Sequence, residues 1–320
     1  MLRRGIVVAS MAMLAAGSAA AQTWPDKPVH IIVAFTPGSA TDVIARAVSN
    51  ELSARLGQPV IIENKPGAGG TIAGDIVAKG PKDGYSALMI STGHTVSAAM
   101  IKSQAYDAVK DFAPVGIVAN SAIAIVAKAD FPANDLKGLI EVIKKDPGKY
   151  NYATVGVGST QHLTAELFRQ RAGLQAQAVS FRTTGEVVTA LLRKDVAYAV
   201  DLAHAVRGQV ESGELKLIAV ATGKRFPSLP KVPTVIESGI PGFEINGWYG
   251  FVYPAGVPQA VIDKTHKALT QVLSRDAVKK QLANIGAEAA LSSPQEFGKL
   301  IADEVTRWRE VAKAAKIEPQ

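Results

Sequence analysis

Two short stretches of the chain have residue types and spacing suited to holding an anion. They are residues 35–42 (Phe-Thr-Pro-Gly-Ser-Ala-Thr-Asp) and residues 154–162 (Thr-Val-Gly-Val-Gly-Ser-Thr-Gln-His). Each follows an apolar, β-branched run typical of a strand and leads into an amphipathic helical pattern. Because the first turn of a helix leaves backbone N–H groups unpaired at the positive end of the helix dipole, it attracts anions. Two such turns predict a clamp for a small acid.

A third candidate loop, Ser91-Thr92-Gly93-His94-Thr95, follows a predicted strand at residues 87–90. In an open parallel sheet, ligands bind beyond the carboxyl ends of the strands, so we expect the three loops to converge. His94 and His162 are candidate donors to a carboxylate, and the alternative for each is a structural or capping histidine. No carboxylate accompanies either histidine at metal-ligand spacing, so no metal site is predicted.

Arg182 adds a fixed positive charge between a predicted strand and a helix that begins with the capping pattern Thr183-Thr184-Gly185-Glu186. Its planar guanidinium suits bidentate binding of a carboxylate. The alternative is an exposed loop arginine without a binding role.

The motifs also bear on two other functions, nucleotide-cofactor binding and hydrolysis. The glycine-rich residues 64–71 lack both the dinucleotide fingerprint, because Ile72 stands where glycine is required, and the Gly-Lys-Ser/Thr ending of a phosphate loop. No cofactor is therefore predicted. The Gly-x-Ser-x-Gly elbow of many hydrolases is also missing around Ser159. A serine hydrolase built from Ser159, His162 and Asp201 stays open, because sequence order does not forbid such a triad.

The ends and composition of the chain indicate an exported protein. Residues 1–21 combine a basic start, an apolar stretch and Ala19-Ala20-Ala21, which predicts a cleaved signal peptide. The chain contains no cysteine, which excludes disulfides and thiolate chemistry. The net charge of +7 is dispersed and aromatic residues make up 6% of the chain, a composition that disfavours a nucleic-acid surface.

The order of the patterns predicts an α/β fold with two lobes. Short β-branched runs alternate with helical patterns, as in parallel sheets covered by helices. About 300 mature residues exceed what one core usually organises. A long apolar run at residues 115–127 is suited to cross from one lobe to the other. We expect lobe 1 to comprise residues 22–122 and 246–320, and lobe 2 to comprise residues 123–245.

Six motifs together resemble a known family: the start Trp24-Pro25-Asp26-Lys27-Pro28, Phe35-x-Pro37-Gly38, residues 63–70, Asp83-Gly84-Tyr85, residues 110–114 and residues 229–234. In order along the chain they resemble the Bug receptors, the periplasmic solute-binding proteins of tripartite tricarboxylate transporters. The resemblance implies a type II-like periplasmic-binding-protein fold in which each lobe is a mostly parallel sheet flanked by helices. It also implies a monomer in the periplasm, without enzymatic activity, that delivers a small mono- or dicarboxylate to membrane subunits.

The resemblance also implies which residues contact the ligand. In lobe 1 these are Phe35, Thr36, Gly38, Ser39, Ala40, Thr41, Asp42, Ser91, Thr92, Gly93, His94 and Thr95; in lobe 2 they are Thr154, Val155, Gly156, Gly158, Ser159, Thr160, His162, Phe181, Arg182, Thr183 and Asp201. Many relatives have Tyr-Lys-Gly where this chain has Phe181-Arg182-Thr183, so the identity of the acid stays open. A secreted serine hydrolase and a periplasmic ligand sensor are the alternative functions.

Overall fold

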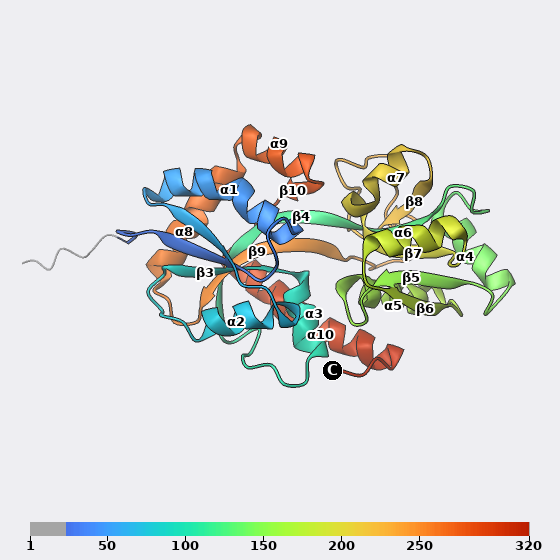
Figure 1. Ribbon diagram of the computed structural model, residues 1–320, viewed down its shortest axis with the longest axis horizontal. Coiled ribbons are helices and arrows are strands. Elements are labelled where there is room, and N and C mark those ends of the chain that lie inside the picture. Colours follow the sequence, from blue (N-terminus) through green and yellow to red (C-terminus); the bar gives the residue numbers. More distant parts are fainter. Residues whose placement is uncertain (1–23, 320) are drawn as a thin grey trace, which may run out of the picture.

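A computed structural model describes residues 24–319 of the chain. The predicted signal peptide, residues 1–21, lies outside the described residues. Two lobes stand side by side, and two long strands, β4 (Phe112–Lys128) and β9 (Asn246–Pro254), run from one to the other (Figure 1). The helix α10 (Pro294–Ala315) spans both lobes on one side of these strands. This two-lobed α/β architecture confirms the predicted fold class.

In each lobe, parallel strands lie beside the crossing strands. In lobe 1 the parallel strands are β1 (Val29–Val33), β2 (Val60–Asn64) and β3 (Ser86–Ser91). In lobe 2 they are β5 (Asn151–Val155), β6 (Gln177–Phe181) and β7 (Tyr198–Leu202). The carboxyl ends of both sets point to the gap between the lobes, so the turns that follow β1, β3, β5 and β6 face that gap.

The crossing strands run antiparallel to their neighbours, so the sheets are less parallel than the sequence predicts. The strand order is β2-β1-β3-β9-β4-β7-β5-β6, and β8 (Leu215–Val220) and β10 (Ala287–Ala289) also pair with β4. β4 pairs antiparallel with β7, β8, β9 and β10. The physical reason is that β4 carries the chain into lobe 2 and β9 carries it back, so the two must run in opposite directions.

Helices cover both faces of each sheet. In lobe 1 they are α1 (Ala40–Leu56), α2 (Thr71–Ala78), α3 (Thr92–Met100), α8 (Gln259–Leu273) and α9 (Asp276–Asn284), with the short 3₁₀ turn η1 (Ala68–Gly70). In lobe 2 they are α4 (Leu136–Lys145), α5 (Thr160–Ala172), α6 (Thr184–Arg193) and α7 (Arg207–Glu211), preceded by the 3₁₀ turn η2 (Ala203–Val206).

The hydrophobic cores follow from this layering. In lobe 2 the buried rings of Tyr152, Phe168 and Tyr198 pack between the sheet and α5, whereas α6 covers the opposite face through Val187 and Leu191. The helix α10 contributes Phe297 to a lobe 1 core and Trp308 to a lobe 2 core. Because α10 buries one of these side chains in each lobe, it links the two lobes on that side of the crossing strands.

Candidate ligand-binding site

The turn of lobe 1 between β1 and α1 is held by a network of hydrogen bonds around Asp42. The side chain of Ser39 caps α1 by accepting from the amide of Asp42 at 3.3 Å. The buried carboxylate of Asp42 accepts from the amide of Gly38 (3.0 Å), from Arg46 Nε (3.0 Å) and from Asn64 Nδ2 (2.8 Å). Burial alone would raise the pKa of Asp42, but these hydrogen bonds outweigh it and hold that pKa below its usual range.

This network leaves two amides of α1 available. The amide of Ser39 donates to the carbonyl of Thr36 at 3.1 Å. Within the part of the chain that the structure describes, the amides of Ala40 and Thr41 have no acceptor, as expected for the first residues of a helix. Figure 1 shows this end of α1 at the edge of lobe 1 that faces lobe 2. The turn therefore presents paired N–H donors to the gap.

The turn of lobe 2 between β5 and α5 repeats this pattern. Ser159 caps α5 by accepting from the amide of His162 at 3.1 Å, and its own amide donates to the carbonyl of Gly156 at 3.3 Å. The amide of Gly158 donates to His162 Nδ1 at 3.0 Å, four residues on, as that of Gly38 does to Asp42. Both glycines need positive φ angles, +84° at Gly38 and +70° at Gly158.

The equivalent amides of α5 are again available. Among residues 24–319, the amides of Thr160 and Gln161 have no acceptor. Burial lowers the pKa of the His162 imidazole, so the ring is neutral at pH 7. An imidazole whose Nδ1 accepts a hydrogen bond carries its proton on Nε2. The first turn of α5 thus offers N–H donors beside a neutral side chain.

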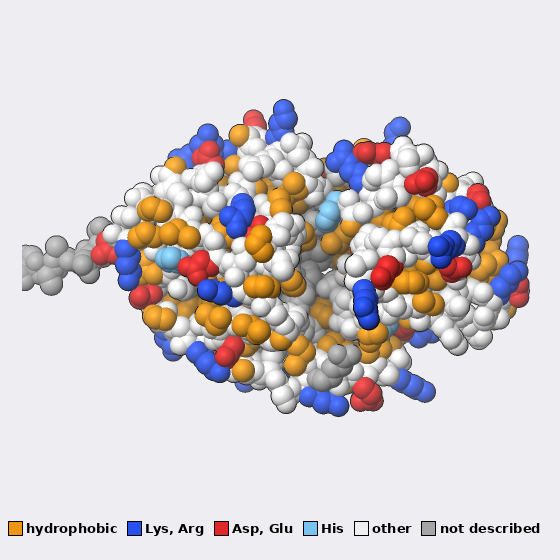
Figure 2. Space-filling model, in the orientation of Figure 1, with side chains coloured by type: hydrophobic (Ala, Val, Ile, Leu, Met, Phe, Trp, Pro, Cys, Tyr) orange, Lys and Arg blue, Asp and Glu red, His pale blue; other side chains and the backbone are white. Residues whose placement is uncertain are grey.

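The N-terminus of α3 meets that of α5 in one cavity. Ser91 begins α3 without a side-chain cap, so its first amides also lack partners within the described residues. Ser91 and Thr92 line a cavity of about 70 Å³ together with Thr160 and Gln161, over a floor formed by the crossing strands. At about 30 Å³ for a water molecule, this space holds about two waters or one carboxylate group. The space-filling view shows the hollow between the lobes (Figure 2).

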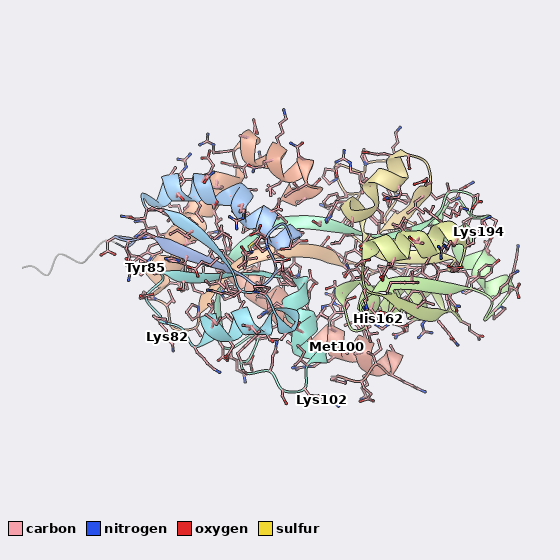
Figure 3. The ribbon with its side chains drawn as sticks, viewed as in Figure 1. Lys82, Tyr85, Met100, Lys102, His162 and Lys194 are labelled. Carbon is pink, nitrogen blue, oxygen red and sulfur yellow. The ribbon has the colours of Figure 1, made fainter. Side chains whose placement is uncertain are left out.

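The two lobes also touch beside this cavity. A Cβ placed on Gly158 would lie 3.3 Å from Cε of Met100, the last residue of α3. Figure 3 shows Met100 and His162 close together at the gap, whereas Lys82 and Lys194 lie at the far ends of the two lobes. The turn after β5, in lobe 2, therefore lies beside the end of α3 in lobe 1.

Asp201, at the end of β7, braces the two helices that face the gap from lobe 2. Its fully buried carboxylate accepts from the Thr184 hydroxyl at the start of α6 (2.7 Å), from Gln161 Nε2 of α5 (3.3 Å) and from the amide of Leu202 (2.7 Å). Burial raises the pKa of Asp201, and these hydrogen bonds partly oppose that change. The side chain positions the N-termini of α5 and α6.

Comparison with known proteins identifies the family. A family model described as the tripartite tricarboxylate transporter family receptor matches residues 44–317. The chain belongs to this receptor family. Its fold resembles that of the periplasmic binding protein BugD, with 34% sequence identity, a TM-score of 0.74 and coverage of 93% of this chain and 100% of BugD.

Two further similar proteins have been solved with carboxylates. An R. palustris protein solved with adipate shares 32% identity and a TM-score of 0.77, covering 93% of this chain and 100% of its own. MatC from Rhodopseudomonas palustris, solved with bound malate, shares 30% identity and a TM-score of 0.72, covering 90% of this chain and 99% of its own. The sequence-based resemblance to the Bug receptors is thereby confirmed.

The receptor structure places two of the predicted side chains in the core of lobe 1. His94 is buried against the rings of Tyr106 and Phe112, and its Nε2 lies 3.0 Å from the carbonyl of Ala108. Burial lowers the pKa of His94 to about 4, so it is neutral at pH 7. The hydroxyl of Thr95 lies 2.9 Å from Glu304 Oε2 and has no exposed surface. Both side chains thus have hydrogen-bond partners within lobe 1, and their predicted contact with a ligand stays a prediction.

Several other predicted residues position the receptor's turns. Asp42, His162 and Asp201 have their acceptor atoms occupied as described above, and the amides of Gly38 and Gly158 are used within the turns. The hydroxyl of Thr92 accepts from the amide of Trp248 at 3.0 Å. Thr154 is fully buried on β5, and Val155 packs partly against the core under α6.

The remaining lobe 2 residues lie at the start of α6. Thr183 caps this helix by accepting from the amide of Glu186, and the amide of Arg182 donates to the Glu186 carboxylate at 2.8 Å. The guanidinium of Arg182 is exposed and forms no ion pair with a described residue. Phe181, at the end of β6, is partly buried against the same core as Val155.

Two contributors were not singled out from the sequence. Gln161 supplies both a cavity wall and a hydrogen bond to Asp201. Glu304 of α10 accepts from Trp248 Nε1 of β9 at 3.0 Å and from the Thr95 hydroxyl of α3. The Glu304 carboxylate thus joins β9 and α3 below the cavity. Burial raises the pKa of Glu304. Only Gln161 has a sequence signal, since it lies in the candidate stretch 154–162; in the structure it is the second residue of α5.

Proposed function

We propose that this receptor binds a small dicarboxylate between its lobes and delivers it to the membrane subunits of a tripartite tricarboxylate transporter. The observation that carries the proposal is the repeated turn: α1 and α5 each present two unpaired amides, on opposite sides of the gap. One carboxylate would be held by Ala40 and Thr41, the other by Thr160 and Gln161. The adipate and malate of the two R. palustris structures are acids of this class.

The energetics fit a metabolite receptor. Each hydrogen bond to a charged group contributes roughly 1.5–3 kcal/mol. A few such bonds, offset by the cost of ordering the ligand and closing the lobes, give about −8 kcal/mol, which corresponds to a micromolar dissociation constant.

Closure would bend the crossing strands near the predicted lobe boundary. β4 pairs with β10 of lobe 1 up to Ser121 and with β7 of lobe 2 from Ile123 onward. This change of partner supports a hinge at residues 122–123 of β4. The chain would pass back from lobe 2 to lobe 1 at a second hinge, at the start of β9. The lobes would then turn about a short segment while each core stays intact.

The geometry favours a binding protein over a serine hydrolase. Ser159 Oγ accepts from the amide of His162, His162 Nδ1 accepts from Gly158, and Asp201 is bonded to Thr184 and Gln161. In this arrangement the imidazole of His162 is oriented by a backbone amide in place of Asp201. We therefore propose that the receptor has no hydrolytic activity.

We propose that the receptor acts in the periplasm, as the periplasmic binding protein BugD does. Among the described helices, none has the length and apolar character needed to cross a membrane. A periplasmic sensor would use the same cleft, and capture of a signalling protein in place of transporter subunits would distinguish it.

Isothermal titration calorimetry with adipate and malate, beside the neutral diamide adipamide, tests the proposal. We expect one of the acids to bind one-to-one with a micromolar constant, and adipamide to bind at least tenfold more weakly because it carries no charge. Equal binding of adipate and adipamide, or no heat with any mono- or dicarboxylate in a wider panel, would contradict it.

A further inference from the structure

A second cavity lies between the lobes, behind the crossing strands. We call it the rear pocket; its volume is about 500 Å³. Lobe 1 contributes the end of α9 and Gly286, and lobe 2 contributes η2, α7, β8 and the segment around Phe226. Figure 1 shows α9 and β10 facing α7 and β8 across the gap. The volume falls within the range of roughly 300–1,000 Å³ typical of small-molecule sites.

The rear pocket is separate from the front cleft, our name for the space between the lobes that the turns before α1 and α5 face. Ala122 lines the rear pocket, whereas the next residue, Ile123, lines the cavity shared by α3 and α5. Successive side chains of a strand point to opposite faces, so β4 stands between the two spaces.

The walls of the rear pocket combine apolar surface with the ion pair of Arg207 and Glu211 at its edge. Phe226, Leu217, Leu229 and Val210 supply the apolar part. The guanidinium of Arg207 pairs through Nε with Glu211 at 2.7 Å, and its two terminal nitrogens have no partner within the described residues. A planar N–H pair of this kind matches a carboxylate or a sulfonate.

His204 adds a buried polar atom without a partner. Its Nδ1 has essentially no exposed surface and no hydrogen-bond partner in the described structure. Because this nitrogen has no exposed surface, an occupant would touch other atoms of the His204 side chain and not Nδ1. His204 also lies against lobe 1, since a Cβ on Gly286 would come within 2.3 Å of the His204 Cβ.

We propose that the rear pocket binds a small amphipathic anion, with an aromatic or branched body against Phe226 and Leu229 and an acidic head at Arg207. The side chain of His204 would form part of the wall around the body. Because both lobes form the walls, an occupant binds one arrangement of the lobes better than another. Such an occupant must then change the affinity of the front cleft for the dicarboxylate. By linkage, the dicarboxylate changes the affinity of the rear pocket for its occupant by the same factor.

The fluorescent probe 8-anilinonaphthalene-1-sulfonate has the required aromatic body and acidic head. We expect the probe to bind the full mature chain saturably and one-to-one. The blue shift of the probe's fluorescence emission measures this binding. Ala283→Trp, at an exposed position of α9 that lines the pocket, fills the space and should weaken binding at least tenfold. Ala314→Trp, at an exposed position of α10 outside the pocket, is the matched control and should bind as the wild type does.

Arg207→Gln tests the head-group contact and should weaken the same binding about fivefold, with a smaller loss at high salt. Circular dichroism melting curves establish that each variant is folded. Absence of saturable binding, or equal affinity in Ala283→Trp and the wild type, would overturn the rear-pocket site. Neither result depends on the front cleft, because the probe is measured without any dicarboxylate.

Discussion

The turns before α1 and α5 have the same hydrogen-bond pattern but different groups at its centre. In both, a serine caps the helix and a glycine amide donates to the side chain four residues on. In lobe 1 that side chain is the carboxylate of Asp42, fixed by Arg46 and by Asn64 from β2. In lobe 2 it is the neutral imidazole of His162.

The difference shows that a turn can be held in shape by either a charged or a neutral acceptor, with different consequences. The negative charge of Asp42 would repel an anion bound at the neighbouring amides, and Arg46 at 3.0 Å offsets that charge. The turn of lobe 2 needs no such compensation. We therefore expect lobe 1 to have the more rigid turn and lobe 2 to have the stronger attraction for a carboxylate.

Proline substitution at the first helical residue gives the largest expected effect, because it removes an amide hydrogen from either turn. Ala40→Pro and Thr160→Pro should each weaken dicarboxylate binding by roughly tenfold or more, the cost of one hydrogen bond to a charged group. Helices favour proline at this position, and Ser39 and Ser159 already have the extended backbone required before proline. Calorimetry measures the affinities.

Matched controls separate the amide from other effects of these substitutions. Asp276→Pro occupies the same position in α9, away from the cleft, and should bind normally. Thr160→Ala removes the hydroxyl and keeps the amide, so it should lose less affinity than Thr160→Pro. Wild-type affinity in both Ala40→Pro and Thr160→Pro would show that these amides do not hold the ligand.

The comparison predicts a larger stability loss in lobe 1. Asp42→Asn leaves the donors of Gly38, Arg46 and Asn64 poorly matched and should lower the unfolding free energy by about 2 kcal/mol at pH 7, measured by urea denaturation. Since the pKa of Asp42 is lowered in the folded state, its contribution is present above the unfolded value of 3.8 and is lost as the pH falls through the folded value. A difference that stays constant down to pH 2.5 would contradict this.

His162→Gln should have a smaller effect and a different pH window. The pKa of the folded His162 lies below the unfolded value of 6.5, so acidification protonates the unfolded chain first and reduces stability. The wild type should therefore lose stability between pH 7.5 and 5.5 more steeply than His162→Gln, in which the glutamine oxygen can still accept from Gly158. Urea denaturation at several pH values checks this, and parallel pH curves would argue against it.

Arg182→Ala gives the smallest expected effect on binding. An exposed guanidinium in water contributes little per contact, so we expect a two- to fivefold loss of affinity that disappears at high salt. Calorimetry at low and high ionic strength measures it. A loss above fiftyfold would mean that Arg182 is enclosed with the ligand and forms a bidentate contact.

The local patterns of the sequence predicted the repeated turn because its determinants lie within about ten residues. Ser39 and Ser159 are typical helix caps, and each follows a β-branched strand. The pattern of α4 is equally local, because Leu136, Leu139 and Ile143 recur at helical spacing and are buried. The long run that became β4 was also recognised as a connection between lobes.

Other parts of the site depend on contacts that are distant in sequence. Glu304 reaches Thr95 across 209 positions. His94 is enclosed by the rings of Tyr106, in the loop after α3, and of Phe112, the first residue of β4. No local pattern encodes either contact. The sequence predicts a loop at residues 91–95 because they directly follow a predicted strand. Thr92, Gly93 and Thr95 have low helix propensity, yet packing against α10 makes them part of the first turn of α3.

A crystal structure of the receptor with the dicarboxylate that binds it most tightly tests the central claim most directly. The account predicts one carboxylate within 2.7–3.2 Å of the amides of Ala40 and Thr41 and the other at the same distance from those of Thr160 and Gln161, typical hydrogen-bond lengths. A ligand held in the cleft by side chains alone, with all four amides bonded to water or unpaired, would contradict it.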